Sequence, residues 1–197
     1  VNPDGNGRDS VSSAPARISC GVTCTASFNY GTVVVLSATA LTGSRFDGWS
    51  GEGCSGSSAC TMTVDSAKNV TATFTIITYT LTVTRAGAGA GAVTSELGEI
   101  SCGSNCSAVL NYGTVVTLSA SADTGSTFAG WSGSCSGPGT CVVTMTANRS
   151  VTATFNPPAF PLSVSTTGGN GTGSVTSVPA GINCGITCTA DFDTGTV

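Results

Sequence analysis

Apolar and small polar residues alternate along most of this chain. In residues 33–38, Val34, Leu36 and Ala38 fall on one side of an extended strand, and the residues between them fall on the other. The same alternation occurs in 115–120, and in 70–74 and 151–155, where Val, Ala and Phe alternate with Thr. Period-two alternation predicts strands with one buried face, and a Thr-coated outer face suits a half-exposed antiparallel sheet. No segment shows ten or more residues of helical periodicity, so the pattern predicts an all-β fold.

The strand pattern is repeated along the chain. Gly-Trp-Ser-Gly occurs at 48–51 and at 130–133, and the cysteine pair at 20/24 returns at 102/106 and 184/188, a period of 82 residues because 102 − 20 and 184 − 102 are equal. A fixed period of this kind indicates a tandem array of small antiparallel β modules, each of about 80 residues. We predict module 1 at 1–77 with a truncated first strand, a complete module 2 at 78–159 and a partial module 3 at 160–197.

The first and last modules are incomplete as sequence units. We therefore expect the chain to be part of a longer protein. The alternative is that half-modules of neighbouring chains complete each other, which would produce a fibre.

Ten cysteines and no histidine favour disulfides over a metal site and predict an oxidising, extracellular setting. The spacings are Cys-x3-Cys and Cys-x5-Cys, whereas cysteine-only zinc sites usually carry two Cys-x2-Cys pairs. Four cysteines in a module allow three connectivities. We infer local pairing because the last two cysteines of modules 1 and 2 keep the same spacing although module 2 has lost one residue before them. The predicted disulfide residues are Cys20, Cys24, Cys54, Cys60, Cys102, Cys106, Cys135, Cys141, Cys184 and Cys188.

Glycine and proline mark the connections between strands. The stretch Gly87-Ala88-Gly89-Ala90-Gly91 predicts a hairpin turn, because it lacks the lysine and the following helix of a phosphate-binding loop. The predicted linkers are 76–79 and 156–161, and three prolines stiffen the second one.

Composition excludes several classes of function. Charged residues make up 8% of the chain and the net charge is −4, so no basic surface for nucleic acid is expected. No run of 18 apolar residues is present, so we predict no membrane span in this segment. The absence of histidine removes the usual general base, and we predict a protein that is not an enzyme and binds no cofactor.

Two local motifs resemble functional sites by chance. Asp123-Thr-Gly and Asp193-Thr-Gly match the aspartic protease signature, but they occupy unrelated positions of the module, so two carboxylates cannot meet by symmetry. The segment 4–9 resembles a calcium loop, but modules 2 and 3 carry Ala, Gly and Thr there. We interpret the two aspartate motifs as turns and predict no metal site.

Two large aromatic residues are candidates for recognition. Trp49 and Trp131 could stack on sugars, together with Tyr30 and Tyr112. Each tryptophan follows a phenylalanine by three residues in the middle of the pattern, where a large aromatic more often anchors the core of a small module. We favour the core interpretation over a glycan platform.

The module as a whole resembles a known family. Leu81-Thr-Val-Thr, Cys102-x3-Cys106, Tyr112-Gly-Thr-Val-Val-Thr-Leu, Phe128-Ala-Gly-Trp-Ser-Gly, Cys135-x5-Cys141 and Val151-Thr-Ala-Thr-Phe together resemble the divergent internalin-type B-repeat. The resemblance implies a compact β module found in series in secreted or surface-anchored prokaryotic proteins, with no catalytic residues.

We therefore expect a non-enzymatic extracellular structural repeat that forms a stalk or filament. The expected partners are identical neighbouring repeats or subunits, with surface glycans as an adhesive option. The alternative function is a carbohydrate-binding accessory module of a secreted hydrolase.

Overall fold

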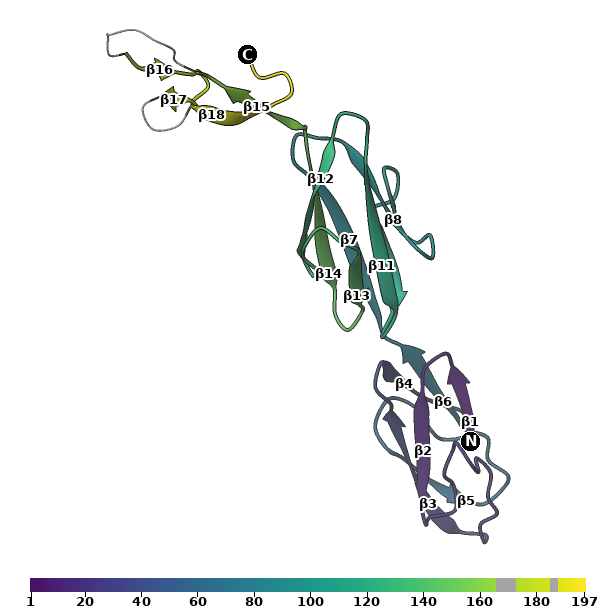
Figure 1. Ribbon diagram of the computed structural model, residues 1–197. Helices are drawn as coiled ribbons and strands as arrows, with labels where there is room; N and C mark the ends of the chain where they lie inside the picture. The colour runs from purple at the N-terminus through teal and green to yellow at the C-terminus, as the bar shows by residue number, and fades with distance from the viewer. Residues whose placement is uncertain (166–172, 185–187) are drawn as a thin grey trace. The chain divides into compact units, whose positions relative to one another are not determined.

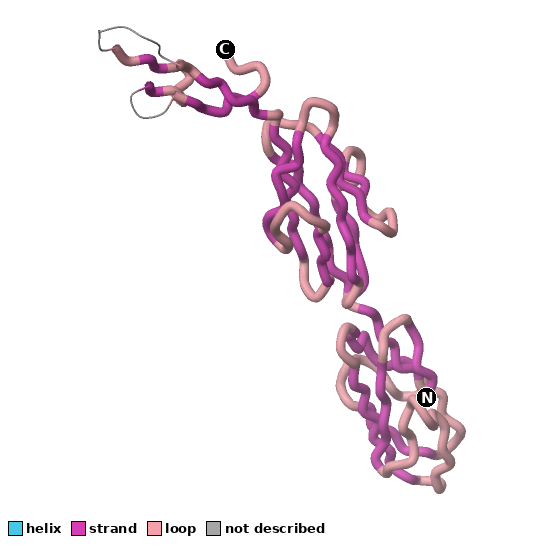
Figure 2. The backbone as a smooth tube through the Cα atoms, viewed as in Figure 1, coloured by secondary structure: helices cyan, strands magenta, loops and turns pink. Residues whose placement is uncertain are grey.

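The computed structural model describes residues 1–165, 173–184 and 188–197. These residues contain strands, turns and loops and no helix (Figure 2), which confirms the all-β fold. We call residues 1–77 repeat 1, residues 78–159 repeat 2 and residues 160–197 the C-terminal segment. These limits remain predictions, because the chain divides into two compact units with other limits. The first unit contains residues 1–81, 109–115 and 144–149, and the second contains residues 82–108, 116–143 and 150–197.

Repeat 1 is built from two three-stranded sheets, ordered β1-β6-β4 and β2-β3-β5 (Figure 1). Its strands are β1 (Asn2–Gly5), β2 (Asp9–Ala14), β3 (Thr32–Ala40), β4 (Ser44–Ser50), β5 (Cys60–Val64) and β6 (Thr71–Ile76). Alternate residues of both sheets are buried together. Val11, Val34 and Leu36 of one sheet join Trp49 and Phe74 of the other in one hydrophobic core.

Repeat 2 has two four-stranded sheets, ordered β10-β7-β14-β12 and β13-β11-β8-β9. Its strands are β7 (Thr78–Ala86), β8 (Gly91–Ser95), β9 (Ser101–Cys102), β10 (Ser107–Asn111), β11 (Val115–Ala122), β12 (Thr127–Gly133), β13 (Cys141–Thr144) and β14 (Arg149–Asn156). Val116, Leu118, Val151, Ala153 and Phe155 are buried. These are the apolar positions that the alternation assigns to the inner face.

The C-terminal segment forms two small two-stranded sheets, β15-β18 and β16-β17. Its strands are β15 (Ala159–Ser163), β16 (Val175–Thr176), β17 (Asn183–Cys184) and β18 (Thr189–Asp193). Both pairs are antiparallel. Every residue of β15 is exposed.

Two features differ from the sequence expectation. The stretch 87–91 is not a hairpin turn, because β7 and β8 belong to different sheets and do not pair. The glycines carry the chain from one sheet to the other. In addition, β1 pairs with β6 in parallel, whereas the other registers of repeat 1 are antiparallel. A parallel pair of strands needs a long connection. Here strands β2 to β5 connect β1, the first strand of the repeat, to β6, the last.

Neither predicted linker is a long loop. β6 ends at Ile76 and β7 begins at Thr78, so only Ile77 lies between them. In the second linker, β14 ends at Asn156 and β15 begins at Ala159. The connections are therefore shorter than the sequence indicates.

Candidate functional site

All ten cysteines are joined in five local pairs. The pairs with four-residue separation, Cys20–Cys24, Cys102–Cys106 and Cys184–Cys188, have Cα atoms 4.6, 4.4 and 4.6 Å apart. The pairs with six-residue separation, Cys54–Cys60 and Cys135–Cys141, have Cα atoms 5.5 and 5.7 Å apart. These distances lie within the range that a disulfide spans. The disulfides are those that the constant spacing favours.

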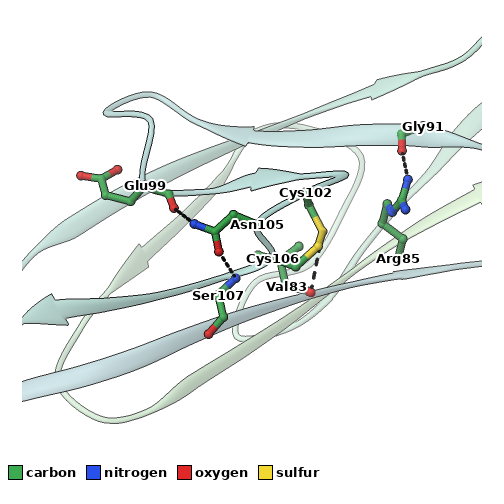
Figure 3. Close-up of a disulfide and its surroundings, with 8 residues drawn as sticks. All are labelled: Val83, Arg85, Gly91, Glu99, Cys102, Asn105, Cys106 and Ser107. Carbon is green, nitrogen blue, oxygen red and sulfur yellow. Dashed lines mark hydrogen bonds between the residues drawn. A yellow bond between two sulfur atoms is a disulfide. The ribbon is translucent and has the colours of Figure 1, made fainter.

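The disulfide between Cys102 and Cys106 closes a tight loop beside β7 (Figure 3). The N–H of Val83 in β7 donates to the carbonyl of Cys106 at 2.8 Å. Inside the loop, Asn105 Nδ2 donates to the Glu99 carbonyl at 3.1 Å (Figure 3). Cys106 is therefore held both by the disulfide to Cys102 and by the backbone hydrogen bond from Val83.

A serine hydroxyl organises the loop before each of these disulfides, a role that sequence reasoning missed. Ser13 Oγ accepts the N–H of Ile18 at 3.0 Å, and Ser95 Oγ accepts the N–H of Ile100 at 2.9 Å. Ser177 Oγ holds Ile182 N–H in the same way at 3.0 Å. The sequence does carry a signal for this role. A serine recurs as the last residue of Val11-Ser-Ser13, Val93-Thr-Ser95 and Val175-Thr-Ser177.

An aromatic cluster occupies the core of each repeat. The Phe46 ring lies 5.2 Å from the Trp49 ring and 5.0 Å from the Phe74 ring, measured between centroids. In repeat 2, Phe128 lies 5.1 Å from Trp131 and 5.4 Å from Phe155. Edge and tilted contacts of this kind stabilise aromatic groups in a core.

A β-bulge makes this cluster possible. Residues three apart in a regular strand point to opposite faces. The register of β12 against β14 shifts between Phe128 and Gly130, so Phe128 and Trp131 both reach the core. Gly130 has a φ of 138° and Gly48, at the same place in repeat 1, has 146°, which side chains rarely adopt. The glycine before each tryptophan is therefore a structural requirement.

Both tryptophans lie inside the repeats. Trp49 is 4% exposed and Trp131 is 5% exposed. The indole of Trp131 also donates from Nε1 to the Gly139 carbonyl at 2.7 Å. Stacking on a sugar needs a free ring face, so the structure favours the core interpretation.

The motifs that resemble catalytic or calcium sites lie in turns and sheet edges. Asp123 directly follows β11 and Asp193 ends β18, and each starts a turn with its carbonyl as acceptor. In the calcium-like segment, Asn6 Oδ1 accepts the Ile76 N–H at 3.0 Å. Within the described ranges, no cluster of three or more metal-ligating side chains occurs.

Repeat 1 carries a groove of about 500 Å³. We call it the strand groove and define it by its main lining residues, which are Tyr30, Val34, Leu36, Met62, Val64 and Val70. Asp65 and Lys68 also line it, and their carboxylate and ammonium groups are 2.6 Å apart. The hydrogen bond from Lys68, followed by that from Ser66, lowers the pKa of the Asp65 carboxyl, and the same bond to Asp65 raises the pKa of Lys68. The charges of Asp65 and Lys68 offset each other, and the ammonium group of Val1 also lines the groove.

Comparison with known proteins identifies the module. The family described as the Divergent InlB B-repeat domain matches residues 10–78 and, again, residues 79–159. The chain belongs to this family. The first matched copy leaves out β1, and each matched copy contains two of the disulfides described above.

A solved structure is similar to the chain only at low sequence identity. The major pilin protein T-13 of Streptococcus pyogenes is similar to this B-repeat chain at 12% identity and a TM-score of 0.34, over 68% of this chain and 69% of the pilin chain. No curated protein matches the chain. In the part of the B-repeat chain that the structure describes, no helix is long and apolar enough to cross a membrane.

Proposed function

We propose that this chain is a non-enzymatic structural repeat of a secreted or cell-surface prokaryotic protein, and that it serves as part of a stalk or filament. One observation carries the proposal. The same β module occurs twice in succession, and each copy has its own core and its own two disulfides.

The chemistry of the module suits a passive role outside the cell. Repeats that each bury their own core add length without adding a new active centre. Disulfides persist in oxidising compartments, which supports an extracellular location. A small domain has little core to spare, and covalent bonds offset that deficit.

Single-molecule pulling tests the mechanical role directly. The full chain is held between handles and stretched under oxidising conditions. We expect one unfolding event for each complete repeat, with a gain in length of roughly 20 nm per event for a module of this size. Reduction should lengthen each event by roughly 3 nm, because the disulfide loops then extend as well. Smooth extension at low force, without discrete events, would rule out a load-bearing stalk.

An adhesive role is the second candidate, and one observation favours it. Tyr30 is 85% exposed and offers a free aromatic face. A glycan array probed with the full chain tests this role, with Tyr30→Ser as the loss variant. Binding that Tyr30→Ser abolishes would support adhesion, and an array without signal would leave the stalk as the function.

A further inference from the structure

Repeat 2 carries a cleft of about 550 Å³ where the chain leaves the sheet of β7 and enters the sheet of β8. We call it the crossover cleft and define it by its main lining residues, which are Val83, Arg85, Ala86, Gly91, Cys102 and Phe155. Val83, Cys102 and Phe155 are almost fully buried, so the cleft reaches down to the hydrophobic core. It therefore offers apolar surface to an aliphatic side chain and has room for one.

One charged side chain lines the crossover cleft. The Arg85 guanidinium donates a hydrogen bond from Nη1 to the Gly91 carbonyl at 2.8 Å (Figure 3). Among the described residues, no carboxylate forms an ion pair with it. A guanidinium presents several N–H donors in a planar fork that matches a carboxylate. The remaining donors of Arg85 can therefore bind a carboxylate that enters the cleft from another molecule.

The loop between β8 and β9, residues 96–99, has the complementary chemistry. Leu97 is 72% exposed and lies in a turn that is closed by the hydrogen bond from the Gly98 N–H to the Ser95 carbonyl at 3.1 Å. Glu96 is exposed beside it, and in the part of the chain that the structure describes its carboxylate forms no ion pair. An aliphatic side chain next to an unpaired carboxylate is the combination that the crossover cleft can accept.

The loop and the cleft lie close to the same disulfide. Asn105 Nδ2 donates to the carbonyl of Glu99 in the loop, and the next residue, Cys106, lines the cleft. In Figure 3, Glu99 lies on one side of the disulfide and Arg85 on the other. Two copies related by a two-fold axis can therefore exchange loops, so that each loop fills the cleft of the other copy. Self-complementary pairs of this kind are the commonest symmetric assemblies.

Repeat 1 lacks both halves of this arrangement. At the period of 82 residues, Pro3 stands at the place of Arg85, and Pro15 stands at the place of Leu97. Repeat 1 therefore has neither a guanidinium at the crossover nor a leucine in the loop. Two features that occur together in one repeat and are both missing from the other are what a paired role predicts.

We propose that the crossover cleft binds the 96–99 loop of a second copy of this chain, with Leu97 against the apolar lining and the Glu96 carboxylate on the Arg85 guanidinium. Burial of the leucine is favourable, and the ion pair adds orientation and specificity. Each contact is small, so we expect a weak dimer that forms at high protein concentration. The proposal identifies a partner for the repeat and does not depend on the stalk role.

Sedimentation equilibrium of the full, oxidised chain tests the proposal. We expect a monomer–dimer equilibrium that Leu97→Ser weakens by at least about 10-fold, since this variant loses the buried aliphatic side chain. The matched control is Val142→Ser, because Val142 is also an exposed aliphatic residue, at 54%, but lies on β13. The control should leave the equilibrium unchanged. An amidated peptide with the sequence of residues 95–100 should compete with the loop and dissociate the dimer.

A charge swap tests the ion pair separately from the fold. Arg85→Glu and Glu96→Arg each bring like charges together, and each should weaken the dimer by about 10-fold or more. The double variant restores opposite charges and should regain the dimer, whereas damage to the fold would give no such rescue.

Three outcomes would overturn the proposal. They are a chain that stays monomeric at its highest soluble concentration, a Leu97→Ser variant that dimerises like the unchanged chain, and a double variant that gains nothing over the single variants. Peptide binding to a chain that stays monomeric would count against it as well, since the cleft would then accept the loop of a different protein. These results are independent of the pulling experiment, which measures the force response of single chains.

Discussion

Trp131 Nε1 donates a hydrogen bond to the carbonyl of Gly139 at 2.7 Å, whereas the equivalent Nε1 of Trp49 is buried and finds no acceptor among the described residues. The indole N–H therefore has a hydrogen-bond acceptor in repeat 2 and, over the ranges that the structure describes, none in repeat 1. Repeat 1 has one more residue than repeat 2 between the tryptophan and the next cysteine.

This difference predicts unequal costs for the same substitution. Trp131→Phe leaves a carbonyl without its donor, while Trp49→Phe removes a donor that was already unpaired. We expect Trp131→Phe to lower the free energy of unfolding of its repeat by about 1 kcal/mol more than Trp49→Phe does. Native-state hydrogen exchange at Leu36 and Leu118 reports each repeat separately. Equal losses in both repeats would show that this hydrogen bond contributes nothing.

The bulge glycine gives a second prediction. An added Cβ at Gly130 would lie 3.2 Å from the Gly137 carbonyl oxygen, on a backbone with φ of 138°. Gly130→Ala should therefore cost about 1–3 kcal/mol of stability in repeat 2. The control is Gly139→Ala, because a Cβ there meets nothing within 4 Å and φ is unstrained. Urea denaturation measures both, and a Gly130→Ala variant as stable as the control would contradict the role of the bulge.

The sequence predicts the strands and the repeats well, because both depend on local alternation and on copying. It does not predict the bulge, since Phe128-Ala-Gly-Trp reads as a plain strand until the register is known. The glycine stretch 87–91 shows another limit. Turn residues indicate that the chain changes direction, but the sheet that the next strand joins depends on packing elsewhere.

The same reasoning applies to the candidate site. Constant cysteine spacing was enough for the disulfides, because a local pair depends only on local geometry. The strand groove could not be predicted, because its lining side chains come from separate segments that only the fold brings together. Single serines such as Ser95 also escape notice in a chain rich in serine, where their recurrence at one place of the repeat gains meaning only from their hydrogen bonds.

Ser95 offers a third prediction. Its buried hydroxyl accepts the N–H of Ile100, which is itself buried. Ser95→Ala would leave that N–H without a partner, and we expect a loss of about 1–3 kcal/mol. Ser119→Ala, at an exposed position of β11, is the control and should change stability by less than about 0.5 kcal/mol. Thermal denaturation followed by circular dichroism separates the two.

The ion pair at the groove predicts a pH dependence. Because the folded pKa of Asp65 is lowered, its stabilising contribution is present above the unfolded pKa and is lost as pH falls through the folded value. For Lys68, whose folded pKa is raised, the contribution is present below the unfolded pKa and is lost as pH rises through the folded one. NMR titration of the Asp65 carboxyl should give a higher pKa in Lys68→Met. An unchanged titration would show that the pair does not form in solution.

The last prediction concerns the disulfides. Each repeat has two of them, and each disulfide closes a short loop that persists in the unfolded chain. The chain-entropy estimate for loops of this size is about 2 kcal/mol each, so removing one pair should cost a large part of the stability of a small module. We expect Cys135→Ser with Cys141→Ser to lower the urea midpoint of repeat 2 and to leave hydrogen exchange at Leu36 in repeat 1 unchanged. Full reduction should then destabilise the unmodified chain more than this variant, since the disulfide of Cys102 with Cys106 would be lost as well. If the double variant kept its midpoint, the disulfide of Cys135 with Cys141 would contribute nothing measurable to the stability of repeat 2, which would then rest on the hydrophobic core and the remaining disulfide.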